Sequence, residues 1–182
     1  MMVSIGIIEV SNIAKGYLIC DNILKKTQVR MVMAQPICPG KFVMIFGGTV
    51  SSVHIACEYA QENFADKILD VSEFGNIDVR VFDALNGAAS GETSGALGII
   101  ETFSVASCIL SADAALKAAA VEICELRVAR GMGGKSYVAL SGTVAAVTAG
   151  VEAGAQFAIE NGILNDTAII ASPHEDLWQY LQ

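Results

Sequence analysis

The sequence has few charged residues and no run of basic ones. Asp, Glu, Lys and Arg make up 16% of the 182 residues, and the net charge is -8. Phosphate backbones bind clustered Lys and Arg, so this composition argues against nucleic acid as a partner. Hydrophobic residues reach 53%, and the mean hydropathy is +0.53. Such an apolar composition predicts that much of the surface is buried between subunits.

Long apolar segments are missing as well. The longest uncharged runs, residues 42–57 and 136–151, are shorter than a membrane span and contain glycine turn signals. No basic region precedes the first apolar residues, and no small-residue cleavage site precedes Glu9 and Lys15. We therefore expect no membrane association and a cytoplasmic location.

The cysteines do not form a recognisable framework. There are five of them, an odd number, and none forms a Cys-x-x-Cys pair. This pattern argues against a set of disulfides and fits a reducing compartment. Four of the five lie in apolar helical or strand patterns and are predicted to be core residues: Cys20, Cys57, Cys108 and Cys124.

Catalytic patterns are also absent. The chain has no Gly-x-Gly-x-x-Gly loop and no visible nucleophile and base arrangement. Glu9 and Glu101 occupy equivalent strand ends, and their repetition favours a structural role over an acid and base pair. We predict that the protein is not an enzyme. A small redox enzyme and a trimeric regulator that binds a ligand between subunits remain alternatives.

What the chain does contain is the same unit twice. Residues 5–9 recur as residues 97–101, and the same offset relates Asp21 to Asp113 and the pair at 24–25 to the pair at 116–117. After a two-residue insertion in the second copy, further motifs match: Gly40-Lys41 with Gly134-Lys135, and Gly48-Thr49-Val50 with Gly142-Thr143-Val144. The repeat predicts a first domain at 1–87, a linker at 88–95 and a second domain at 96–182.

Each copy predicts the order β-α-β-β-α-β-α, an α+β fold with a four-stranded antiparallel sheet and helices on one face. A helical stripe of apolar residues is expected to face the core of the first copy at Ile13, Tyr17, Leu18 and Leu24. Strands are expected at residues 4–10, 29–34, 41–46 and 69–74, and at 96–102, 121–129, 135–140 and 167–171. Short helices are expected to end the copies at 79–85 and 175–181.

The first hairpin loop is unusual. It reads Pro36-Ile37-Cys38-Pro39-Gly40, in a chain that has only three prolines. Two prolines should exclude this segment from the flanking strands and hold the thiol in a defined place. The plain alternative is a strand-to-strand turn with a small buried cysteine.

The repeated motifs resemble the bacterial microcompartment shell domain, here in tandem. They are the opening Gly-Ile-Ile-Glu, the Asp-x-x-Leu-Lys helix, the glycine-containing hairpin, the Gly-Thr-Val helix start and the closing Pro173-His174. The first hairpin loop further resembles that of the iron-sulfur tandem shell proteins of propanediol-utilisation compartments. The resemblance implies a homotrimer, a pseudohexameric tile with a central pore, located in a microcompartment shell in lateral contact with other shell proteins.

The resemblance also implies site residues. Cys38 would be the metal ligand, so that three copies hold one 4Fe-4S cluster per trimer for electron transfer, with an encapsulated redox enzyme as a candidate partner. Lys25 and Lys117 match the lysine at the edges between tiles. The pore loops would be Ile37, Cys38, Pro39 and Gly40, alternating with Met132, Gly133 and Gly134. The alternatives are a plain pore for metabolites and a redox enzyme acting at the open iron.

Overall fold

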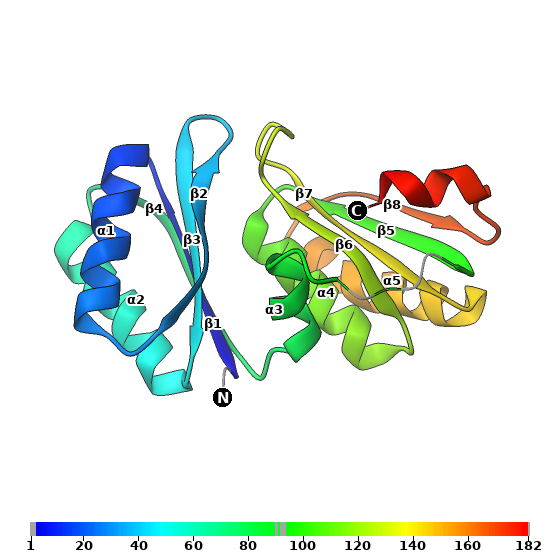
Figure 1. The fold of residues 1–182 in the computed structure, drawn as a ribbon, viewed down its shortest axis with the longest axis horizontal. Coiled ribbons are helices and arrows are strands. Elements are labelled where there is room, and N and C mark those ends of the chain that lie inside the picture. Colours follow the sequence, from blue (N-terminus) through cyan, green and yellow to red (C-terminus); the bar gives the residue numbers. More distant parts are fainter. Residues whose placement is uncertain (1–2, 90, 92–93, 182) are drawn as a thin grey trace. The chain divides into compact units, whose positions relative to one another are not determined.

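A computed structural model of the chain describes residues 3–89, 91 and 94–181. Its contacts divide the chain into two compact units, residues 1–79 and 80–182. Each unit contains one four-stranded antiparallel sheet with helices (Figure 1), so the predicted fold class is confirmed. The predicted linker at 88–95 lies partly outside the described residues, at positions 90, 92 and 93.

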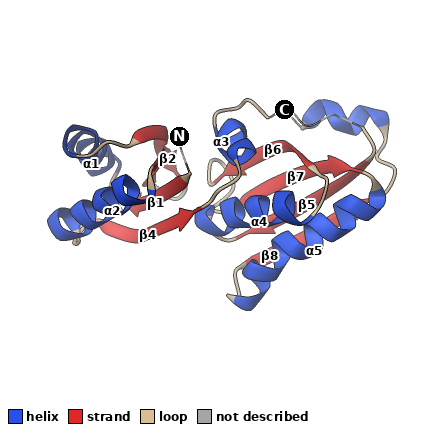
Figure 2. Ribbon diagram, turned by 90° about the horizontal axis from the view of Figure 1, so that it is seen from below, coloured by secondary structure: helices blue, strands red, loops and turns tan. Residues whose placement is uncertain are grey.

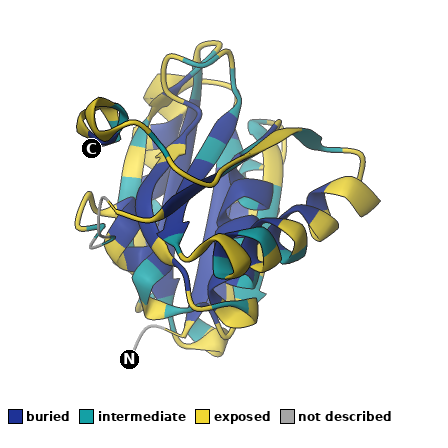
Figure 3. Cartoon of the chain, turned by 90° about the vertical axis from the view of Figure 1, so that its right-hand side faces the viewer, coloured by how far each residue is buried: buried dark blue, intermediate teal, exposed yellow. Residues whose placement is uncertain are grey.

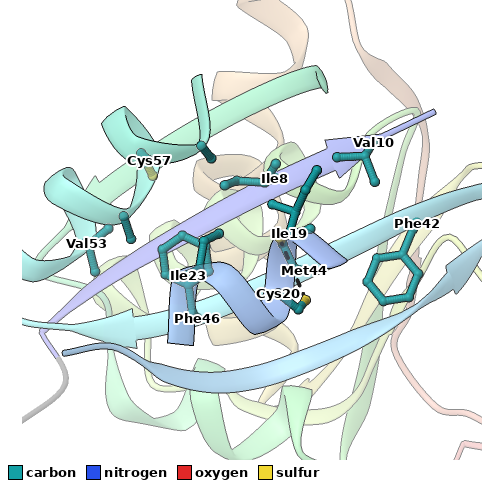
Figure 4. Packing of buried hydrophobic residues seen from close by; sticks show 12 residues of the cluster. Ile8, Val10, Ile19, Cys20, Ile23, Phe42, Met44, Phe46, Val53 and Cys57 are labelled. Carbon is teal, nitrogen blue, oxygen red and sulfur yellow. Dashed lines mark hydrogen bonds between the residues drawn. The ribbon is translucent and has the colours of Figure 1, made fainter. Parts of the chain in front are cut away.

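The first unit contains two helices on one face of its sheet. The strand order is β2-β3-β1-β4, with every neighbouring pair antiparallel. Ile8 and Phe46 of the sheet pack against Ile19 and Ile23 of one helix and Val53 of the other (Figure 4). The elements of this unit are β1 (Ser4–Val10), α1 (Ile13–Lys26), β2 (Arg30–Ile37), β3 (Lys41–Gly48), α2 (Val50–Phe64) and β4 (Ile68–Gly75).

The second unit repeats this arrangement with the strand order β6-β7-β5-β8. Two long helices, α4 and α5, cover one face of its sheet (Figure 2). The elements are α3 (Val79–Leu85), β5 (Ala96–Thr102), α4 (Val105–Ala118), β6 (Glu122–Val128), β7 (Ser136–Gly142), α5 (Val144–Glu160), β8 (Leu164–Ile170) and the 3-10 helix η1 (Glu175–Tyr180).

The opposite face of the second sheet is also covered, which corrects the expectation that helices pack on one face only. Trp178 of η1 packs in a cluster with Leu97, Cys124 and Ala139 of the strands. Side chains alternate between the two faces of a strand, and Gly98 lies against α5. The Leu97 side of the sheet is therefore the face away from α4 and α5.

Helix α3 lies with the second unit, although the sequence places it at the end of the first copy. The Arg80 guanidinium donates to the carbonyl of Val121 at 3.2 Å and lies 3.3 Å from Glu122. It also donates to the carbonyl of Leu116 in α4 at 3.5 Å. These contacts attach α3 to the end of α4 and the start of β6.

The predicted apolar stripe of α1 is wrong. Ile13, Tyr17 and Leu24 are exposed, whereas the buried residues of α1 include Gly16 and Cys20. A Cβ atom on Gly16 would lie 2.3 Å from the Phe42 ring, so this glycine lets the helix approach the sheet closely. The inner face of α1 is thus partly made of small residues, which a search for large apolar side chains overlooks.

Buried residues concentrate on the strands and on the sheet-facing sides of the helices, whereas the hairpin loops and the C-terminal segment are mostly exposed (Figure 3). Both α2 and α5 start at the predicted threonine caps. The Thr49 side chain accepts a hydrogen bond from the Ser52 N–H, and the Thr143 side chain accepts one from the Ala146 N–H. The duplicated Gly-Thr-Val motif therefore fixes the same helix start in both units.

Candidate functional site

The candidate metal ligand lies in a tight turn between β2 and β3. Ile37 pairs with Lys41, so the turn consists of Cys38, Pro39 and Gly40. Gly40 has a φ of +76°, a conformation that residues with side chains resist. The Cys38-Pro39 peptide bond is cis. The turn thus places the thiol at the end of a hairpin, with Pro39 and Gly40 exposed beside it.

The expectation that the prolines exclude the whole segment from the strands is wrong for Pro36 and Ile37. Both belong to β2, where Pro36 pairs with Phe42. This strand lies at the edge of the sheet, where a residue without an N–H donor is tolerated because no further strand needs that donor. Ile37, predicted as a pore-loop residue, is buried at the end of the strand.

Cys38 differs from the other cysteines in its surroundings. It is half-buried, whereas Cys20, Cys57, Cys108 and Cys124 are buried, which confirms the prediction that these four are core residues. Burial raises the pKa of Cys20 to about 11 and that of Cys57 to about 12, and it also raises the pKa of Cys108 and Cys124. Metals bind the thiolate, so burial disfavours metal binding at these four positions.

An ion pair lies next to the loop of each hairpin. Lys41 Nζ lies 3.3 Å from the Glu9 carboxylate, and the matched Lys135 Nζ lies 2.6 Å from the Glu101 carboxylate. The same two strands are joined in the same way in both copies. The two glutamates therefore have the structural role that their repetition predicts.

The second hairpin has a longer, glycine-rich loop at residues 129–135, between β6 and β7. The Lys135 N–H donates to the Met132 carbonyl at 3.1 Å, and the Ala129 N–H donates to the Lys135 carbonyl at 3.1 Å. Gly131, Gly133, Gly134 and Ala129 all have positive φ angles. This loop carries no cysteine, and Gly133 is exposed while Met132 and Gly134 are half-buried.

A single chain does not assemble a metal site in its described part. Among residues 3–89, 91 and 94–181, no three His, Cys, Asp or Glu side chains come together to hold a metal ion. Cys38 therefore stands alone as a candidate ligand within one chain. Iron at this thiol would need ligands from other copies.

The two predicted edge lysines lie in the last turns of α1 and α4 and make the same contact. Lys25 Nζ is 2.6 Å from the Asp21 carboxylate, and Lys117 Nζ is 2.6 Å from the Asp113 carboxylate. Both lysines are exposed. The helix thus presents the same charged pair in both units.

A buried polar cluster in the second unit was not predicted. Glu125 in β6 is buried, accepts a hydrogen bond from the Tyr137 hydroxyl and is paired with Arg127. Burial, together with the hydrogen bond to Glu125, raises the pKa of Tyr137 to about 12. The signal in the sequence is the pair of opposite charges, Glu125 and Arg127, two residues apart in a strand. The cluster lies within one sheet and joins β6 to β7.

None of the described helices has the length and apolar character that a membrane span requires.

Comparison with known proteins gives a consistent result across the chain. The model of the BMC domain matches residues 4–76 and again residues 96–173. The bacterial microcompartment shell protein PduT of Citrobacter freundii is 37% identical over 181 residues, which cover 100% of this chain and 98% of that protein.

Solved structures agree with this match. The crystal structure of a microcompartment protein from Desulfitobacterium hafniense has a TM-score of 0.94 and 41% identity, covering 98% of this chain and 99% of that one. A fused, permuted hexameric shell protein from the RMM microcompartment has a TM-score of 0.60 and 22% identity, covering 82% of this chain and 80% of that one. The second likeness is one of fold alone.

Proposed function

Because the chain belongs to the BMC-domain family of microcompartment shell proteins, we propose that three copies form a pseudohexameric shell tile with a 4Fe-4S cluster in its central pore. One Cys38 from each chain would ligate the cluster. The observation that carries the proposal is the position of this thiol, which alone among the five lies outside the apolar interior, in a rigid turn.

Three-fold symmetry would supply the cysteine ligands that a single chain lacks. One cysteine per chain gives three thiolates around a three-fold axis, which leaves one iron without a protein cysteine. The lack of a three-ligand group within the described part of one chain agrees with a site shared between copies. Soft thiolate sulfur is the ligand that iron-sulfur clusters prefer.

The two kinds of hairpin would alternate around such an axis. The loop at 129–135 brings glycines and backbone N–H groups but no thiol, which leaves space and hydrogen-bond donors for the sulfurs. When bound, a cluster of this type supplies one-electron transfer. The tile would then pass electrons across the shell to or from an encapsulated redox enzyme, and the chain itself would have no catalytic role.

Measuring iron and sulfide tests the proposal. Anaerobically reconstituted protein should bind about four iron atoms per trimer and give a low-temperature electron paramagnetic resonance signal on reduction. The Cys38→Ser variant should lose both because a hydroxyl is a poor ligand for such a cluster, while the trimer stays intact.

Cys124→Ser is the matched control because Cys124 is a buried core residue, and it should keep its iron. A Cys38→Ser protein that retains the cluster would contradict the assignment of the ligand. A wild-type trimer without iron would leave a plain pore-forming tile. Catalytic turnover at the open iron would instead favour a redox enzyme.

A further inference from the structure

The two hairpin loops begin at equivalent positions, although the second loop is longer. In the first hairpin, the last paired residues are Ile37 and Lys41. In the second, the Ala129 N–H donates to the carbonyl of Lys135, which is the residue that matches Lys41 in the repeat. Ile37 and Ala129 are both buried. The residue that follows each of them is therefore the first residue of its loop, and each loop extends beyond the helices of its own unit (Figure 1).

That first loop residue is Cys38 in one hairpin and Arg130 in the other. The strand pairs just before the loops support the equivalence, since Pro36 and Val128 pair with matching residues of β3 and β7. The same number of residues then leads from Pro36 to Cys38 and from Val128 to Arg130. The additional residues of the second loop thus come after Arg130 and do not separate it from its strand.

Arg130 brings a positive charge that its own chain does not neutralise. The two cations on either side of it are paired, Arg127 with Glu125 and Lys135 with Glu101. Arg130 is exposed, and within residues 3–89, 91 and 94–181 its guanidinium has no ion pair or hydrogen bond. A guanidinium is not deprotonated in proteins, so the charge is permanent. The second loop therefore has a free positive charge at the position where the first loop has a thiol.

Three-fold symmetry would place these two residues on alternating loops around one axis. Three chains would contribute three thiols from Cys38 and three guanidinium groups from Arg130 to the same end of the ring of hairpins. Thiolate ligands make an iron-sulfur site negative, and an added electron makes it more so. Net charge and hydrogen bonding around the sulfurs are among the factors that set the potential of such a site. Positive charge nearby favours the reduced state because it offsets the added electron.

We propose that Arg130 raises the reduction potential of the site at Cys38 by surrounding it with three positive charges. This inference rests on the cluster and trimer proposed above, and it names the residue that tunes them for electron transfer. Reduction takes one electron from an external donor, no covalent bond forms or breaks, and Arg130 keeps its proton throughout. Arg130 acts through its charge and is not an iron ligand, so its loss should leave iron binding intact.

The test is a redox titration of the anaerobically reconstituted trimer, followed by electron paramagnetic resonance. Arg130→Gln removes the charge and should lower the equilibrium constant for one-electron reduction about tenfold, which corresponds to a fall of about 59 mV in potential. Arg130→Lys keeps the charge and should stay close to the native potential. The iron content of both variants should equal that of the native trimer.

Arg30→Gln is the matched control because it removes the same charge from an exposed arginine elsewhere in the chain. Arg30 is the first residue of β2, and Cys38 follows the last. At about 3.3 Å per residue, the strand separates the two by about 25 Å. At that distance a charge exposed to solvent is largely screened by salt, so the potential should not change.

The outcomes separate this inference from the proposed function. An Arg130→Gln trimer that holds the cluster at the native potential would overturn the inference and leave Cys38 as the ligand. An equal shift in Arg30→Gln, or a shift in Arg130→Lys as large as that in Arg130→Gln, would also overturn it because the local charge would not be the cause. Loss of iron from Arg130→Gln would overturn it too, since Arg130 is given no part in holding the cluster. A native trimer without iron would overturn both the proposed function and this inference.

Discussion

The five thiols show how strongly the local environment decides chemistry at the scale of single residues. Cys108 is fully buried, and desolvation disfavours its charged form, whereas Cys38 lies at the end of a hairpin in partial contact with solvent. The Cys20 sulfur has Met44 as a neighbour at 3.8 Å inside the core. The position of a cysteine in the fold, rather than the number of cysteines in the chain, thus selects the candidate ligand.

His54 provides a titration that can be measured at the same scale. Its Nδ1 lies 3.0 Å from the Glu73 carboxylate, and this hydrogen bond, followed by the charge of Glu73, raises the pKa of His54 above 6.5. The folded-state pKa is the higher one. The pair therefore stabilises the fold fully below pH 6.5, and its contribution is lost as the pH rises through the raised pKa.

We expect an NMR titration to give a higher pKa for His54 in the native protein than in Glu73→Gln. The urea midpoint of the native protein should also fall slightly over that pH interval, because an exposed pair contributes little. The variant should show a flatter profile, and His174 serves as the internal reference signal. Identical titration of His54 in both proteins would show that the contact does not persist in solution.

At the scale of elements, α4 and α5 pack closely because small residues line their contact. A Cβ atom on Gly154 of α5 would lie 2.6 Å from the carbonyl oxygen of Ser111 in α4. The Ser111 hydroxyl is fully buried in this contact and has no hydrogen-bond partner in the part of the chain that the structure describes. A buried hydroxyl without a partner costs stability.

Ser111→Ala should therefore leave the free energy of unfolding unchanged or raise it by about 1 kcal/mol, because it removes an unsatisfied polar atom. The matched change is Ser107→Ala in the same helix, where the Ser107 hydroxyl accepts a hydrogen bond from Ser104 at 2.7 Å. That loss should lower the free energy of unfolding by about 1 kcal/mol. Urea unfolding of both variants measures the contrast, and equal destabilisation would mean that Ser111 has a partner in solution.

The elements also show what sequence reasoning can and cannot reach. The first strand and the threonine-capped helices were predicted at their observed starts because each depends on local patterns that occur twice. The inner face of α1 was missed because Gly16 and Cys20 are small, and β2 was cut short because an edge strand accepts Pro36. The attachment of α3 to the second unit depends on tertiary contacts that no local pattern encodes.

The candidate site, too, could be predicted only in part from the sequence. The prolines and glycine around Cys38 indicate a defined turn, but its assignment as a metal ligand depends on the resemblance to the iron-sulfur shell proteins. The surroundings of the thiol in an assembly could not be derived, because a site shared by several copies is not encoded in the local sequence of one.

At the scale of the whole molecule, duplication gives one chain two versions of each surface. The ion pair of Lys25 and Asp21 recurs as Lys117 and Asp113, although the aspartate side chain is 54% exposed in the first copy and 10% exposed in the second. The two lysines are exposed in both copies, so they suit contacts that repeat around a ring of domains.

The lysines therefore lead to a prediction about sheets of tiles rather than about the trimer. In the double variant Lys25→Glu with Lys117→Glu, groups on neighbouring tiles that accept a lysine N–H would face a carboxylate instead, so lateral assembly should weaken. The new carboxylate at position 25 stands four residues from the exposed Asp21, and a like-charge pair at this spacing on a helix surface costs only about 0.2–0.5 kcal/mol. Asp113 is buried, so the change at position 117 costs more, and circular dichroism of the variant checks that the second unit stays folded.

Electron microscopy measures the assembly of tiles into sheets, and sedimentation of the dispersed protein measures whether the trimer persists. The double variant should remain a trimer and form fewer or smaller sheets, while the control Lys26→Glu, which reverses the charge of the next exposed residue of α1, should form sheets normally. If the double variant forms sheets of normal extent, both lysines are solvated surface charges without a role in lateral contacts. A variant that also lost its trimer would instead place the lysines at the contact between chains of one tile, because the fold of each unit is checked separately.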